Sequence, residues 1–228
     1  CDVVVFGRVD VSDEGVVKDK PLTNNKSLFK GNTVQNEFLP SMFTYDMGFG
    51  VSVWGKMYRL DVFKRYELKF ISEREIISED AYFALELYSK DITVGIVNEN
   101  LYFYYVRSDS LSRTYKEDRQ IKNDIFLQKS LEYIRACGLP QVVENHLTVR
   151  YHFFTLSAIK QIATSSLSKK EKKIALRNIF SNRIFRSTLK KSVLCCEDFN
   201  LRLFFISIKY RCYFISDILL KIKLSKRK

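Results

Sequence analysis

The chain has 228 residues, enough for one large domain, and 46% of them are hydrophobic, which excludes general disorder. Its net charge of +12 is unevenly placed: residues 1–150 carry 20 Lys and Arg against 22 Asp and Glu, whereas residues 151–228 carry 18 against 4. The nearly neutral N-terminal part and the strongly basic C-terminal part indicate two roles. The basic part should favour anionic partners such as lipid headgroups or nucleic acid.

The cysteines suggest that the chain is reduced and cytosolic. Five cysteines, an odd number without any CxxC spacing, argue against a disulfide framework. Charge-free runs in the tail, such as residues 203–208, are too short to span a bilayer. Because the chain opens on Cys1 and enters a strand-like run at once, we expect it to be a piece of a longer polypeptide.

The first third of the chain predicts strands, a turn and short helices. Residues 2–11 read as a buried strand, residues 12–15 as a turn, and residues 16–19 as a return strand of a hairpin. The apolar spacing of residues 34–43 suits a short helix. A Gly-rich entry followed by apolar positions between residues 54 and 63 predicts another helix of two to three turns.

An acidic pair opens the next predicted helix. Ser78 can act as the N-cap, with Glu79 and Asp80 in the first turn, where carboxylates meet the positive end of the helix dipole. Residues 92–106 then predict two short strands around a turn at residues 98–100.

The remainder of the chain is predicted to be helical. One helix covers residues 118–137 and ends at a Gly-Leu-Pro stop signal, a second covers residues 142–164, and a third begins within residues 165–173. Strands mixed with helices, followed by helices alone, predict an α/β region with an α-helical appendage.

Three stretches, in this order, carry a resemblance: "VWGKMYRLDVF" (residues 53–63), "ISEDAYFALELY" (residues 77–88) and "NENLYFYYVRSDSLSR" (residues 98–113). With "DVVVFG" (residues 2–7) before them, they resemble the second half of a bacterial family 2 glycosyltransferase of the GT-A fold, of the type that builds capsular and other surface polysaccharides.

The resemblance implies a division of the chain into two domains. Residues 1–115 would form the acceptor-side half of a GT-A-like mixed-sheet domain, and residues 116–228 a basic α-helical C-terminal region. The implied reaction moves a hexose from a nucleotide-diphosphate sugar to a saccharide or lipid-linked acceptor with inversion.

The resemblance implies that the acidic pair is catalytic. In that family an "ED" pair before the acceptor-side helix supplies the general base, and here it falls on Glu79 and Asp80, of which we favour Asp80. A one-step displacement needs a carboxylate to take the proton of the attacking hydroxyl. The alternative is an acid pair that only caps the helix.

Further site residues follow from the same resemblance. Trp54, the sole tryptophan, would stack on a sugar near the acceptor and donor, or else be a core residue at a helix start. Lys56 and Arg59 would neutralise diphosphate or acceptor charge, or else be exposed residues of an amphipathic helix.

The resemblance implies that the polar loop after residue 106 closes over the nucleotide diphosphate. Arginine and serine donate charge-assisted and neutral hydrogen bonds to phosphate oxygens. The alternative is a solvated loop. The residues expected to bind diphosphate are Arg107, Ser108, Ser110 and Arg113.

We assign no metal ligands in this chain. The resemblance implies a divalent metal, Mg or Mn, for the full-length enzyme, held by paired acids in a nucleotide-binding half. The acids of residues 10–14 lie after the first strand and look like a hairpin turn, so they are not assigned to it. We therefore expect the chain to be inactive alone.

The basic tail offers a second role. Residues 183–228 mix apolar side chains with Lys and Arg and could lie on an anionic membrane surface or pack as a helical cap on the domain. The rival reading is a non-enzymatic basic helical protein that binds membrane or nucleic acid; since no helix-turn-helix or zinc signature is present, we expect no nucleic acid. The expected location is cytoplasmic, with peripheral attachment to the inner face of the cell membrane as an option.

Overall fold

The chain divides into two compact units in a computed structural model. Unit 1 comprises residues 1–113 and 125–147, and unit 2 comprises residues 114–124 and 148–228. The predicted boundary at residue 115 therefore lies close to the end of the first segment of unit 1, although a later segment also belongs to that unit. The structure describes residues 1–15, 17–22, 25–44, 49–106, 115–195 and 199–225, with side chains for all of these but 192–195 and 221–225.

The strands described belong to one mixed sheet in unit 1. The central pair, β1 and β5, is parallel, while β2 and β4 pair antiparallel with β1, and β3 pairs antiparallel with β5. Together with the helices this is an α/β fold, as the sequence predicted. The strands are β1 (Val3–Ser12), β2 (Val17–Lys20), β3 (Leu28–Phe29), β4 (Lys56–Tyr58) and β5 (Val94–Val106).

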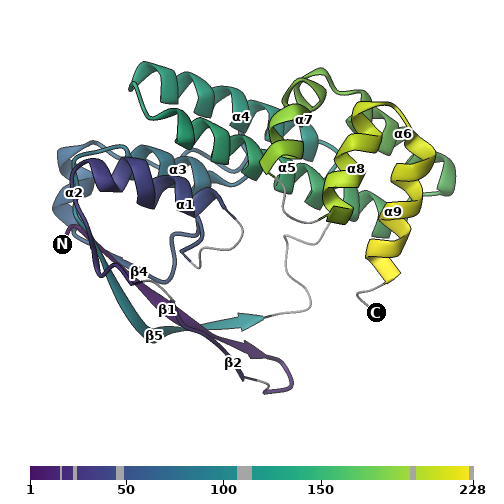
Figure 1. Cartoon of the computed structure of the whole chain (residues 1–228). Helices are drawn as coiled ribbons and strands as arrows, with labels where there is room; N and C mark the ends of the chain where they lie inside the picture. Colours follow the sequence, from purple (N-terminus) through teal and green to yellow (C-terminus); the bar gives the residue numbers. More distant parts are fainter. Residues whose placement is uncertain (16, 23–24, 45–48, 107–114, 196–198, 226–228) are drawn as a thin grey trace. The chain divides into compact units, whose positions relative to one another are not determined.

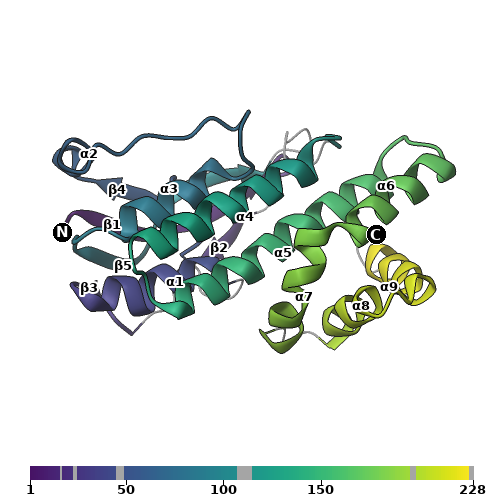
Figure 2. The same ribbon diagram turned by 90° about the horizontal axis from the view of Figure 1, so that it is seen from above.

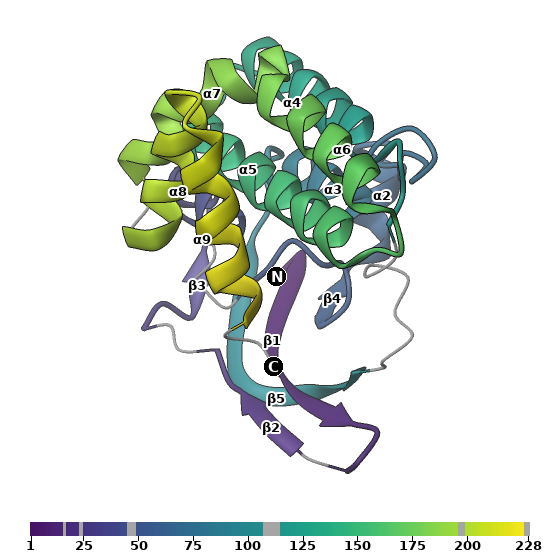
Figure 3. The ribbon, with the colours of Figure 1, turned by 90° about the vertical axis from the view of Figure 1, so that its right-hand side faces the viewer.

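The predicted hairpin is confirmed, since β1 and β2 pair across a turn at residues 12–15. The prediction of two short strands around residues 98–100 is wrong, because one strand, β5, runs through the whole region. The register along β1 shifts there: Phe6 faces Val97, but Gly7 faces Asn100. It shifts again before Arg8, which faces Tyr102, so three residues of β5 are extra in all. They form a bulge that keeps the strand paired where a turn was expected, and Figure 3 shows β5 bending strongly along its length.

Helices cover one face of this sheet. Figures 1 and 2 show α1 and α3 lying across the strands on the same side. The predicted helix at residues 34–43 is confirmed, as a π-helical turn that continues into α1. The elements are η1 (Val34–Phe38), α1 (Leu39–Phe43), α2 (Leu60–Arg65) and α3 (Glu79–Tyr88).

The predicted helix over residues 54–63 is largely wrong. Residues 56–58 form β4, whose Lys56 pairs with Val5 of β1, and α2 begins only at Leu60. Gly50 and Gly55 adopt positive φ angles of 55° and 71°, which break a helix before that point. The apolar spacing that suggested a helix is therefore divided between a turn, an edge strand and a short helix.

Aromatic rings and alternating valines build the core of unit 1. Val3 and Val5 are buried on the face of β1 that the helices cover. Phe38 packs against Phe29, Phe49 and Tyr88, with ring centroids 4.9 to 5.2 Å apart. These contacts hold η1, β3 and α3 together and leave the start of α3 to face the segment before β4.

Unit 2 consists of helices joined by short connections, as the sequence predicted. The first turns of α4 contact α5 through hydrogen bonds from Arg119 to Ser157 and from Tyr151 to Asp124. Helix α7 packs against α8, and α8 packs against α9 (Figure 2). The helix predicted to start within residues 165–173 begins with a capping box formed by Ser168 and Glu171. The helices are α4 (Arg119–Ala136) and α5 (Gln141–Thr164), which contribute to both units, and α6 (Lys169–Ser181), α7 (Arg183–Cys195), α8 (Phe199–Lys209) and α9 (Tyr213–Ser225).

A buried carboxylate joins three of these helical segments. Asp124 of α4 accepts hydrogen bonds from Gln120 Nε2 at 2.8 Å, from the Tyr151 hydroxyl at 2.7 Å, and from Asn182 Nδ2 at 2.7 Å. The Asn182 side chain also accepts the N–H of Phe185 at the start of α7. These three hydrogen bonds offset the free-energy cost of burying the Asp124 carboxylate.

Candidate active site

Asp80 lies where the sequence placed it, in the first turn of α3. Its Oδ2 accepts a long hydrogen bond, 3.4 Å, from the backbone N–H of Val53, the residue before Trp54. Ser78 occupies the N-cap position in the left-handed conformation (φ 58°, ψ 60°), and its hydroxyl makes no capping bond. The start of the helix is thus confirmed, whereas the predicted role of the Ser78 side chain is wrong.

The surroundings of Asp80 make it a stronger base than an ordinary aspartate. Burial raises the pKa of the Asp80 carboxyl, and the Val53 N–H and the positive charge of Lys56 only partly oppose that change. Burial also raises the pKa of Glu79, with a further contribution from the neighbouring negative charge of Asp80. Raised carboxyl pKa values are typical of groups that accept a proton in catalysis.

Lys56 fastens the turn that precedes β4. Its ammonium group donates to the carbonyl oxygens of Phe49 (3.2 Å), Gly50 (3.3 Å) and Ser52. An ammonium has three N–H donors, so the turn uses all of them. Burial lowers the pKa of Lys56 to about 8, although the negative charge of Asp80 acts in the opposite direction. In this arrangement Lys56 positions the turn that carries Trp54.

Trp54 belongs to an aromatic and cationic cluster on β1 and β5. Its ring stacks with Tyr102 at 5.3 Å and with Tyr104 at 4.8 Å between centroids. The Arg8 guanidinium carbon lies 5.0 Å from the Trp54 ring centroid, and Arg8 Nε donates to Asp10 at 2.6 Å. Trp54 lies half-buried in a turn, so the alternative of a core residue at a helix start is wrong. The sugar-stacking role stays a prediction.

Tyr58 links the turn to the acidic pair. Its hydroxyl donates to the Val53 carbonyl oxygen at 3.0 Å. Burial and the negative charge of Asp80 together raise the pKa of Tyr58, so its phenol stays protonated. Val53 therefore contacts two side chains of the site, through its N–H to Asp80 and through its carbonyl to Tyr58.

The other residues selected from the sequence lie elsewhere or outside the described part. Arg59 donates to Asp61 at 3.0 and 3.1 Å on the exposed side of α2, in a surface ion network that includes Arg65. The expected diphosphate residues lie outside the described residues: Arg107, Ser108, Ser110 and Arg113.

Arg8, Tyr102 and Tyr104 were not selected from the sequence as residues of the site. Strand alternation does place Arg8 with Asp10, and Tyr102 with Tyr104, on single faces. What the sequence lacks is the register, in which Arg8 faces Tyr102 across the β1–β5 pair. Only that pairing brings a cation over the indole.

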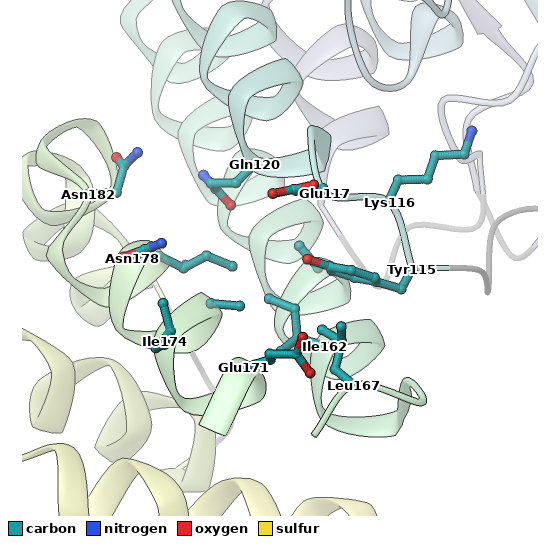
Figure 4. A pocket seen from close by; sticks show the side chains of 13 residues that line it. Tyr115, Lys116, Glu117, Gln120, Ile162, Leu167, Glu171, Ile174, Asn178 and Asn182 are labelled. Atoms are coloured by element: carbon teal, nitrogen blue, oxygen red, sulfur yellow. The ribbon is translucent and has the colours of Figure 1, made fainter. Parts of the chain in front are cut away.

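A separate pocket of about 450 Å³ lies within unit 2. Figure 4 shows its lining, which comes from the segment before α4 and the first turn of α4, from α5, and from α6 with the residues on either side of it. Several of its polar groups already serve the fold: Gln120 and Asn182 bind Asp124, and Glu171 caps α6. We assign it no ligand.

The described residues contain no cluster of metal ligands and no membrane-spanning helix. Within residues 1–225, apart from the gaps given above, no three or more His, Cys, Asp or Glu side chains gather as metal ligands would. Among the helices that the structure describes, none has the length and apolar character to cross a membrane.

Comparison with known proteins adds no relative. No protein-family model, curated protein or solved structure matches this chain significantly.

Proposed function

We propose that this chain forms the acceptor side of an inverting glycosyltransferase of the GT-A type, with Asp80 as the catalytic base. The observation that carries the proposal is the setting of Asp80: a half-buried carboxylate of raised pKa in the first turn of α3, bonded to the backbone next to the sole tryptophan. The ordered motifs at residues 53–63, 77–88 and 98–113 give independent support.

The reaction we infer is a single displacement. Asp80 accepts the proton of the acceptor hydroxyl while that oxygen forms a bond to the anomeric carbon of the donor hexose. The bond to the nucleoside diphosphate breaks, and the diphosphate leaves with the electron pair. Because the pKa of Asp80 is raised, its carboxylate is a better proton acceptor than an exposed aspartate.

The cluster around Trp54 supplies an aromatic surface for a sugar ring. Stacking on Tyr102 and Tyr104 and the bonds that Lys56 makes to the turn hold the indole rigidly. A preorganised aromatic group loses little conformational entropy when a ligand binds. The segment after β5, with Arg107 and Arg113, remains our proposal for the diphosphate ligand set. A divalent metal would be bound by the nucleotide-binding part.

The test measures hexose transfer from nucleotide-diphosphate sugars to a panel of saccharides, with this chain and with the gene product that contains it. Asp80→Asn should lower turnover by about 100- to 10,000-fold, because the amide cannot accept the proton. Acceptor affinity, measured by calorimetry, should stay unchanged. Asp61→Asn, on the exposed side of α2, is the matched control and should keep full turnover.

Two results would contradict the proposal in different ways. Full turnover by the Asp80→Asn variant would show that Asp80 is not the catalytic base. If neither polypeptide transfers any hexose and this chain binds no saccharide in a glycan array, the glycosyltransferase function itself is wrong.

A further inference from the structure

The turn after α8 and the first turns of α9 expose large apolar side chains. Tyr210 is 67% exposed, Phe214 is 78% exposed and Ile218 is 41% exposed. Phe214 and Ile218 are four residues apart in α9 and therefore lie on one side of that helix. Neighbouring aromatic and aliphatic side chains with such large exposed fractions indicate a surface that binds another protein or a membrane.

The opposite sides of α8 and α9 are fixed within unit 2. Phe205 and Ile208 of α8 are buried, and the Ser207 and Ser216 hydroxyls form a 2.7 Å hydrogen bond between the two helices. Arg186 of α7 donates to the carbonyl oxygens of Ile208 and Lys209, both at 3.1 Å, at the end of α8. The exposed groups are therefore presented by an anchored pair of helices.

Two cations flank Tyr210 at the end of α8 and in the turn after it. The Lys209 ammonium lies 5.3 Å from the ring centroid of Tyr210, and Arg211 is exposed in the turn, with φ 60°. Residues 199–225 contain five Lys and Arg and a single acid, Asp217. We call Lys209, Tyr210, Arg211, Phe214 and Ile218 the α8–α9 tip.

We propose that the α8–α9 tip docks on the surface of an anionic lipid bilayer. Phe214 and Ile218 would enter the boundary between headgroups and acyl chains, Tyr210 would lie at headgroup level, and Lys209 and Arg211 would meet the lipid phosphates. Tyrosine at such an interface keeps its ring in an apolar setting and its hydroxyl in water.

The chemistry of the tip favours a bilayer over two other partners. The phosphate backbone of a nucleic acid duplex would attract the two cations, but it offers nothing to Phe214 and Ile218. A second copy of the chain would bring a like-charged tip against this one, which is unfavourable. A bilayer of anionic lipid complements both the apolar groups and the charges.

The experiment is co-sedimentation of the full chain with phosphatidylcholine vesicles that contain or lack phosphatidylglycerol. We expect binding to the anionic vesicles, weakened by added salt. Phe214→Ser should weaken it about tenfold, because the variant loses most of one buried aromatic side chain. The double variant Lys209→Glu/Arg211→Glu should weaken it about 25-fold or more, since each cation contributes about fivefold.

Ile174→Ser is the matched control, because Ile174 is 51% exposed on α6 of the same unit. It should bind vesicles as the wild-type chain does. Phe214, Arg211 and Ile174 are exposed and Lys209 is half-buried, so circular dichroism and thermal melting are recorded for every variant and should match the wild-type chain. Random duplex DNA and single-stranded DNA are used as competitors, and sedimentation velocity reports the oligomeric state.

Several results would overturn the inference. Equal binding to both vesicle types, or full binding by Phe214→Ser, removes the docking role of the tip. Displacement of the vesicles by DNA, or a dimer that Phe214→Ser dissociates, assigns the surface to a different partner. The inference does not rest on the proposed transferase function, because Asp80→Asn should bind vesicles normally and Phe214→Ser should leave transfer to a water-soluble acceptor unchanged.

Discussion

The buried His152 should make the stability of this protein depend on pH. Its ring is 1% exposed within unit 2, with Nδ1 2.7 Å from the carbonyl oxygen of Thr148 and Nε2 3.2 Å from Thr188 Oγ1. Because a carbonyl oxygen only accepts, Nδ1 carries the proton of the neutral ring. Burial lowers the pKa of His152 from 6.5 to about 4, although hydrogen bonds to backbone groups oppose that change.

The sign of the effect follows from proton linkage. Between pH 6.5 and pH 4 the unfolded chain binds a proton at His152 that the folded chain does not, so the free energy of unfolding falls as the pH is lowered. For pKa values of 6.5 and about 4, the loss between pH 7.5 and pH 4.5 is about 2.5 kcal/mol. It approaches about 3.4 kcal/mol below pH 4.

Urea denaturation across this pH range, with wild-type chain and His152→Asn, measures the effect. The variant should be less stable at pH 7.5, because it leaves part of the ring volume empty, but its stability should fall less on acidification. The difference between the two curves isolates His152 from the carboxyl groups, which titrate in both proteins. Parallel curves would refute the argument, as would an NMR titration in which the His152 ring protonates near pH 6.5.

Three further predictions concern stability and are read by urea unfolding. Asp124→Asn should lower the free energy of unfolding by about 2–4 kcal/mol, because it replaces one oxygen acceptor of a buried carboxylate that receives three hydrogen bonds. The control Asp118→Asn, in an exposed ion pair, should lower it by less than about 1 kcal/mol. Equal losses in the two variants would contradict the argument from burial. Gly7→Ala should cost about 1–3 kcal/mol, since its Cβ would lie 3.1 Å from two backbone oxygens; Gly95→Ala, whose nearest obstacle is the terminal Cys1 side chain, should cost less. Because the pKa of Lys56 is lowered to about 8, the wild-type chain should gain stability between pH 8 and pH 10 and Lys56→Met should not; identical pH profiles would show that the amine is not buried in solution.

Local patterns were sufficient for most elements and for the position of the acidic pair. The alternation of residues 2–11, the stop signal after residue 137 and the capping box at Ser168 each depend on side chains a few positions apart. The same holds for Asp80 at the start of α3, because a helix N-terminus is recognised from its own first turn. Interactions between residues that are close in the sequence can be predicted from the sequence alone.

The tertiary structure decided what these elements bring together. It joined Val53 to Asp80, placed Arg8 over Trp54 through the parallel β1–β5 register, and turned Lys56 onto three carbonyl oxygens of its own turn. Residues 54–63 were assigned to a helix because their apolar spacing allows one, yet pairing with β1 drew residues 56–58 into the sheet. Contacts between distant segments depend on strand register and on burial of the whole core, and the local spacing of apolar residues does not specify either.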